Sequence, residues 1–163
     1  MEGIKEGKYP DTEFAKLTSD QQEEIAEAAE EPVIREWIDN PDSTLAKKFP
    51  PKIQAAKFAN LFNQRHERIA QKLNPNSEID LFNTTHKTAT EPFLASGVLI
   101  REKDNQRITK LSDIEGSLKI LDQWESITKT DEQGNPITVI KIRGENYKID
   151  QEIYNQLLAK NNK

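Results

Sequence analysis

The sequence predicts an α/β domain in which helices pack on a small mixed sheet, with a C-terminal β-hairpin and a closing helix. Two amphipathic helical stretches occupy the first half of the chain, and alternating apolar segments occupy the second half. A short apolar run before a polar turn, residues 78–84, predicts a strand between them. The length of 163 residues fits a single domain, since domains commonly contain about 100–200 residues.

We expect four segments within this domain. Residues 1–17 form a loose N-terminal segment, because two glycines and a proline interrupt any regular pattern there. Residues 18–49 form an acidic helical region, and residues 50–159 form the α/β core. Residues 160–163 are polar and terminal, so we expect a frayed tail.

The acidic region begins with a predicted helix over residues 21–38. Thr18-Ser19-Asp20 followed by Glu23 resembles a capping box, in which side-chain and backbone groups bond reciprocally. Pro32 lies inside the pattern, so we expect a kink or two shorter helices that meet at Glu31. A turn ending in Ser43 then predicts a cap and a short helix over residues 44–49.

The clearest predicted helix runs from Pro51 to Leu73. Five apolar residues share one face of it: Phe58, Leu61, Phe62, Ile69 and Leu73. Arg65 lies at the edge of this stripe, where an arginine commonly snorkels beside the core. His66 lies one position further round, and we interpret it as an ordinary residue of the helix surface.

The second half of the chain alternates between strands, turns and helices. The strand over residues 78–84 leads through a polar turn into a helix that begins near Lys87. Residues 101–116 are charged and irregular. Two further strands, 118–130 and 137–143, form a hairpin, and residues 149–158 form the closing helix.

Charge is divided between two segments. The chain carries 23 basic and 28 acidic residues, for a formal net charge of −5. Residues 20–39 contain eight acids and one base, whereas residues 47–72 contain seven bases and one acid. The simplest interpretation is two solvated helix faces with complementary charge. Alternatively, the basic helix borders a site for an anionic ligand, or the two helices dock a protein partner.

Several classes of function are excluded by composition. The chain has no cysteine, and two histidines are too few for a transition-metal site, so we expect no metal and no cofactor. No apolar run is long enough to cross a membrane, and no secretory signal is present, so we expect a cytoplasmic protein. The acidic balance and the lack of aromatics among the lysines disfavour nucleic-acid binding.

His86 is the strongest candidate for a functional residue. It follows the predicted strand at the start of a helix, flanked by the hydroxyl and ammonium donors of Thr84, Thr85, Lys87 and Thr88. Donors that converge at a helix N-terminus suit an oxyanion such as phosphate. Histidine also transfers protons near neutral pH, so His86 is the candidate catalytic residue. The alternative is a turn histidine beside a threonine-rich helix cap.

Glu91 lies five residues after His86 and is a possible acid or base. A helix that starts near Lys87 places Glu91 more than one turn along, facing either the site or solvent. Because helix carboxylates are more often solvated, we favour an exposed Glu91.

The order of these elements resembles the C-terminal half of the histidine phosphatase superfamily, the phosphoglycerate mutase-like fold. The resemblance rests on a helix carrying Arg65 or Arg68, a strand ending in Thr85-His86, a following helix and a terminal pair of strands. In this family of hydrolases and mutases, the corresponding histidine lines the phosphate pocket. The resemblance implies that role for His86, with Thr85, Lys87 and Arg65 as phosphate-binding residues.

The family's nucleophile is a histidine in an Arg-His-Gly motif on the first strand, which this sequence lacks. Arg65-His66-Glu67 lies in a predicted helix, and Lys87 stands where the family often has a glycine. The chain is therefore expected to be either a fragment of a longer phosphatase-like protein or a non-catalytic relative, and whether it is an enzyme stays open. A non-enzymatic protein-interaction domain with opposed acidic and basic helices is the competing hypothesis.

Overall fold

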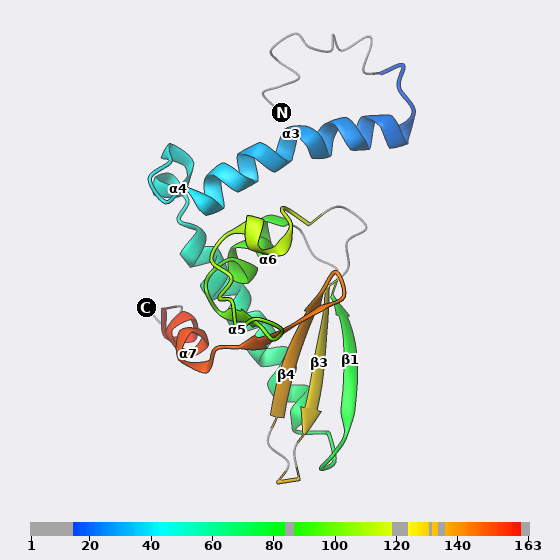
Figure 1. The fold of residues 1–163 in the computed structure, drawn as a ribbon, viewed down its shortest axis with the longest axis vertical. Coiled ribbons are helices and arrows are strands. Elements are labelled where there is room, and N and C mark those ends of the chain that lie inside the picture. The colour runs from blue at the N-terminus through cyan, green and yellow to red at the C-terminus, as the bar shows by residue number, and fades with distance from the viewer. Residues whose placement is uncertain (1–14, 84–86, 119–123, 131, 134–135, 161–163) are drawn as a thin grey trace.

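The chain folds as an α/β structure built around an antiparallel sheet (Figure 1). The computed structural model describes residues 15–83, 87–118, 124–130, 132–133 and 136–160. In chain order its elements are α3 (Ser19–Asp39), α4 (Thr44–Lys48), α5 (Pro51–Ala70), β1 (Glu78–Asn83), α6 (Lys87–Leu94), β2 (Leu99–Arg101), the 3-10 helix η1 (Leu111–Ile114), β3 (Trp124–Thr130), β4 (Pro136–Ile142), β5 (Glu145–Ile149) and α7 (Gln151–Lys160). The predicted α/β class and closing helix are confirmed.

The five strands are ordered β1-β3-β4-β5-β2. Each neighbouring pair is antiparallel, and Trp124 of β3 lies opposite Ile142 of β4, so the predicted hairpin is confirmed. The sheet itself is antiparallel and not mixed. The connection β1-α6-β2 does carry the chain between two strands of the same direction, but these occupy opposite edges of the sheet and never pair.

The sequence interpretation missed the strands β2 and β5. A two-residue turn, Arg143-Gly144, joins β4 to β5, and both residues have positive φ, 48° and 82°. Such turns match the twist of paired strands and favour glycine. Ile149 pairs with Leu99 of β2, so the closing helix begins at Gln151, two residues later than expected.

The helix α3 continues without a break through Pro32. The proline leaves the carbonyl of Ala28 without its helical partner, but both residues are exposed, so water can bond that carbonyl. Of the two expectations, the division into two helices at Glu31 is therefore wrong, and the kink at Pro32 stays a prediction. The capping box at Thr18 is present, although Gln21 completes it in place of Glu23.

The core lies between the inner face of the sheet and helices α5, α6 and α7. Alternate residues of β3, from Trp124 to Thr130, point inward and are buried. Trp124 packs 5.8 Å from Phe58, measured between ring centroids, and Phe62 packs 5.6 Å from Phe93. Leu61, which the apolar pattern placed on the core face, is instead 66% exposed, because Ala55, Ala59 and Phe62 form the inner side of α5.

Two arginines hold the segment around η1 against the sheet. Arg101 of β2 donates to the carbonyl of Asp113. Arg143, in the β4–β5 turn, donates to the carbonyls of Ile114 and Ser117, the latter at 2.8 Å. These contacts fix the position of Ser117, which in turn contacts α6.

No helix within the described ranges is both long and apolar enough to cross a membrane. The cytoplasmic location stays a prediction.

Candidate functional site

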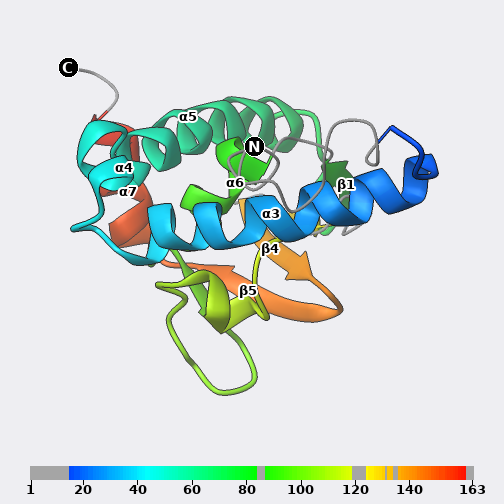
Figure 2. The ribbon, with the colours of Figure 1, turned by 90° about the horizontal axis from the view of Figure 1, so that it is seen from above.

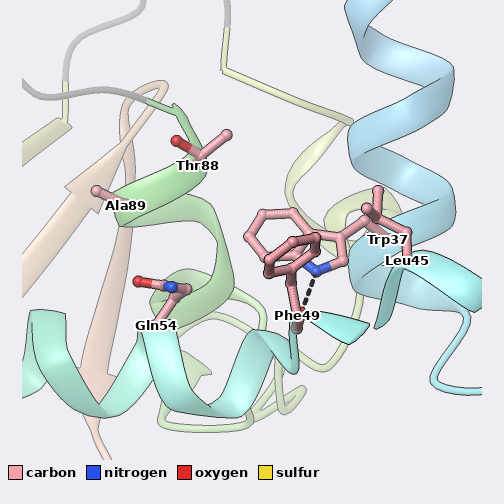
Figure 3. Close-up of a pocket in the computed structure, with 6 residues that line it drawn as sticks. All are labelled: Trp37, Leu45, Phe49, Gln54, Thr88 and Ala89. Carbon is pink, nitrogen blue, oxygen red and sulfur yellow. Dashed lines mark hydrogen bonds between the residues drawn. The ribbon is translucent and has the colours of Figure 1, made fainter. Parts of the chain in front are cut away.

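A cavity of about 360 Å³ lies at the start of α6, the helix that follows the predicted His86 site. It opens between the α3–α4 region on one side and the first turns of α5 and α6 on the other (Figure 3). Its described lining residues are Trp37, Leu45, Phe49, Gln54, Thr88 and Ala89. A volume of this size falls within the range of about 300–1,000 Å³ that is typical of small-molecule sites.

One wall of the cavity is aromatic. Trp37, near the end of α3, is only 7% exposed, and its Nε1 donates a hydrogen bond to the carbonyl of Phe49 at 2.6 Å. This bond ties the end of α4 to α3. Ser43 caps α4 by accepting from the backbone N–H of Ala46 at 3.0 Å. The wall is therefore fixed by hydrogen bonds, while Phe49 keeps 52% of its surface exposed.

The opposite wall carries the polar groups. Gln54 extends from α5, and Thr88 and Ala89 belong to the first turn of α6, which begins at Lys87 (Figure 3). The first backbone N–H groups of a helix have no partners inside the helix and carry a partial positive charge. An anionic group at this end of the cavity would therefore lie near the positive end of the α6 helix dipole.

A lysine borders the aromatic wall. The Nζ of Lys48 lies 5.4 Å from the centre of the Phe49 ring. Its neighbour Lys47 is paired with Asp42 at 3.3 Å, and Lys52 is exposed in the first turn of α5. The cavity therefore combines an apolar wall, a helix N-terminus and a nearby cation.

The predicted site residues are only partly within the described structure. His86 and Thr85 lie outside the described residues. Lys87 is described as the first residue of α6. Arg65 is exposed on α5, eleven residues beyond Gln54 and thus about 16 Å further along the helix axis. Arg65 does not line the cavity, and its phosphate-binding role stays a prediction.

Glu91 is fully buried, so the expected solvated position is wrong. Its Oε1 accepts hydrogen bonds from the Ser117 hydroxyl and the Leu118 backbone N–H, both at 2.6 Å. The side chain faces inward because the segment after η1 packs against α6 at this position. Glu91 therefore fastens that segment to the helix, and its acid or base role stays a prediction.

His66 is also buried, 7% exposed, where the sequence interpretation placed it on the helix surface. Its ring packs against Phe62 with 3.9 Å between ring centroids, and its Nδ1 lies 2.5 Å from the hydroxyl oxygen of Thr128. Burial, and to a lesser extent the charge of Arg65, lowers the pKa of His66 from 6.5 to about 4. His66 is thus a neutral core residue.

The sequence interpretation missed the aromatic wall and Gln54. Trp37 and Phe49 flank the turn at Asn40-Pro41, so the chain reversal between them was a signal that they could meet. Nothing in the sequence indicated that Gln54 lines a cavity, because glutamine is common on the polar face of a helix.

Comparisons with known proteins give no relative: no protein-family model, curated protein or solved structure matches this chain. Among the side chains that the structure describes, no three histidine, aspartate or glutamate residues gather in a way that could hold a metal ion.

Proposed function

We propose that this chain binds a small phosphorylated, or otherwise anionic, molecule in the cavity at the start of α6. The anionic group would contact the first turn of α6 together with Thr85, His86 and Lys87, and the remainder of the ligand would pack on Trp37 and Phe49. The observation that carries the proposal is the position of the cavity, whose wall includes Thr88 and Ala89, directly after the predicted phosphate-binding segment.

The chemistry of both walls supports a ligand with two parts. A phosphate is matched by a helix N-terminus and by hydroxyl and ammonium donors. An aromatic or aliphatic body is matched by the side chains of Trp37, Leu45 and Phe49. An aryl phosphate is the simplest molecule that has both parts.

We further propose that the chain does not transfer the phosphoryl group by itself. The resemblance to histidine phosphatases supplies a phosphate-lining histidine but no Arg-His-Gly nucleophile. The other histidine, His66, is buried against Thr128 and cannot take that role. The chain would therefore act as a binding module, or as the phosphate-binding part of a longer enzyme.

Calorimetric titration with phenyl phosphate, inorganic phosphate and phenol tests the proposal. We expect phenyl phosphate to bind most tightly. His86→Ala should weaken its binding about tenfold or more, because a hydrogen bond to a charged group contributes about 1.5–3 kcal/mol. Ala89→Trp should abolish binding by filling the cavity, whereas Thr109→Val, at an exposed threonine after β2, should have no effect. Equal binding of phenyl phosphate by the native chain and Ala89→Trp would rule out this cavity.

A further inference from the structure

The cavity at the start of α6 contains a polar side chain that the proposed phosphate contact does not use. Two of its six described lining residues, Gln54 and Thr88, have a polar group at the end of the side chain. Thr88 belongs to the first turn of α6, where the anionic group of the ligand would lie. Gln54 comes from α5 and is half-buried. Its amide therefore faces the rest of the ligand and not the phosphate.

The amide of Gln54 suits a ring that carries a hydrogen-bond donor and an acceptor on adjacent atoms. A primary amide presents an N–H donor and an oxygen acceptor side by side in one plane. Glutamine pairs in this way with adenine, through the exocyclic amino group and a ring nitrogen. Because the amide has two N–H donors and an oxygen with two lone pairs, it can bond a ligand while it keeps a contact with the protein. A phenyl ring offers it neither group, whereas the edge of a nucleobase offers both.

Phe49 provides a surface on which such a base can stack. More than half of its surface is exposed, whereas Trp37 behind it is buried. The hydrogen bond from Nε1 of Trp37 to the carbonyl of Phe49, at 2.6 Å, fixes the backbone that carries the ring. Lys48, whose Nζ lies 5.4 Å from the ring centre, covers at most one of the two ring faces. Bases stack on aromatic side chains whatever their identity, and a platform fixed in advance loses less entropy on binding.

Three helices bring these groups to one cavity. Figure 1 and Figure 2 show that α4 links the end of α3 to the start of α5, and that α6 lies between α3 and α5. Phe49 lies at the junction of α4 and α5, Gln54 in the first turn of α5, and Thr88 in the first turn of α6. Figure 3 shows the Gln54 amide beside α6 and across from the rings of Trp37 and Phe49. A ligand that filled the cavity would therefore contact an aromatic ring, an amide and the start of a helix.

We propose that the ligand is a purine nucleoside monophosphate, whose base stacks on Phe49 and bonds through its edge to the amide of Gln54. This inference rests on the proposed function for the phosphate contact at α6 and adds the chemical class of the remaining part. A purine is favoured over a pyrimidine because its two fused rings present more surface to the apolar wall, which includes Trp37 and Leu45. The cavity volume of about 360 Å³ lies in the range for a molecule of this size.

Calorimetric titration of the native chain with three phosphates that differ only in the base is the first test. They are adenosine monophosphate, purine riboside monophosphate, which lacks the amino group of adenine, and ribose 5-phosphate, which lacks the base. We expect adenosine monophosphate to bind about fivefold more tightly than purine riboside monophosphate, because it makes one more hydrogen bond. We expect ribose 5-phosphate to bind at least about tenfold more weakly than either, because it cannot stack.

Two variants separate the hydrogen bond from the stacking. Gln54→Leu should remove the difference between adenosine monophosphate and purine riboside monophosphate. Phe49→Ala should weaken both by about tenfold, because both bases stack. Neither change should alter the affinity for ribose 5-phosphate, and circular dichroism checks that both variants are folded. The matched control is Gln64→Leu, at an exposed glutamine further along α5, and it should bind all three phosphates as the native chain does.

The outcomes distinguish this inference from the proposed function on which it rests. If adenosine monophosphate binds no more tightly than ribose 5-phosphate while phenyl phosphate still binds, the inference fails and the phosphate site stands. A preference for adenosine monophosphate that persists in Gln54→Leu, or binding that persists in Ala89→Trp, would also overturn the inference. If adenosine binds as tightly as adenosine monophosphate and loses affinity in Gln54→Leu, the base contact stands and the phosphate contact fails. Absence of binding by both phenyl phosphate and adenosine monophosphate would overturn both.

Discussion

The imidazole of His66 lies against the hydroxyl of Thr128, with 2.5 Å between Nδ1 and Oγ1, and so joins α5 to β3 inside the core. Ser126 and Thr130 are buried on the same inward side of β3. At this end the contact between α5 and the sheet therefore depends partly on polar groups, whereas around Trp124 it is aromatic.

The burial of His66 makes the stability of the fold depend on pH. The folded pKa of His66 is about 4, below the ordinary 6.5, so the unfolded chain takes up a proton first as the pH falls. The contribution is complete above about pH 6.5 and is lost as the pH falls towards 4, by up to about 3 kcal/mol. Urea unfolding between these pH values should show this slope in the native chain and a flatter one in His66→Gln. Parallel slopes would show that His66 is not the titrating group.

Glu91 should be essential for stability through its contacts with Ser117 and Leu118. Glu91→Ala removes the acceptor of both hydrogen bonds and should lower the free energy of unfolding by about 3 kcal/mol. Glu91→Gln keeps one acceptor oxygen and should cost about 1 kcal/mol. Chemical denaturation measures both. If Glu91→Ala unfolds at the same urea concentration as the native chain, the hydrogen bonds of Glu91 with Ser117 and Leu118 do not contribute to stability.

Trp37 should report ligand binding by fluorescence, because it lines the cavity while the other tryptophan, Trp124, is in the core. Phenyl phosphate should change the emission of the Trp124→Phe variant, in which Trp37 remains. The same ligand should leave the emission of Trp37→Phe unchanged. An emission change that persists in Trp37→Phe would place the ligand elsewhere.

Asp150 should stabilise the start of α7. Its carboxylate accepts from the backbone N–H of Ile153 at 3.1 Å and from Arg107 at 2.6 Å, and these two contacts lower its pKa below 3.8. Asp150→Ala should cost about 1 kcal/mol, as for other helix caps, and Asp150→Asn less. Because the folded pKa is depressed, the stabilisation is present at neutral pH and is lost as the pH falls below about 4. Thermal unfolding of the native chain, Asp150→Ala and Asp150→Asn at neutral and acidic pH measures their differences in stability. These differences should be smaller in acid.

The sequence predicted the helices and strands whose starts, apolar faces and ends are marked by nearby residues. The capped helix after Thr18, the helix after Pro51 and the β3–β4 hairpin each have a start signal, a periodic apolar face and a clear end. β2 was missed because three residues are too short for a period. β5 has one buried side chain, Tyr147, and was missed despite the Arg-Gly turn before it.

The candidate site was predictable only in part. The helix that begins near Lys87 was predictable from residue types at neighbouring positions, whereas the anion site at His86 stays a prediction. The sequence did not predict that Glu91 and His66 face inward. Glu91 bonds to Ser117 and Leu118, and His66 contacts Thr128, and all of these partners lie far along the chain. A polar residue on a helix is solvated by default, and a distant hydrogen-bond partner can reverse that.

By itself, the sequence determined the α/β class, the helices after Thr18 and Pro51, the β3–β4 hairpin, and the separation of charge between residues 20–39 and 47–72, since all of these depend on nearby residues and simple periods. The tertiary structure alone decided that the sheet is antiparallel, that β1 and β2 occupy its opposite edges, and that Trp37 and Phe49 form one wall of a cavity at α6. Those features depend on which surfaces of distant segments fit together when water is excluded, and no local pattern encodes that choice.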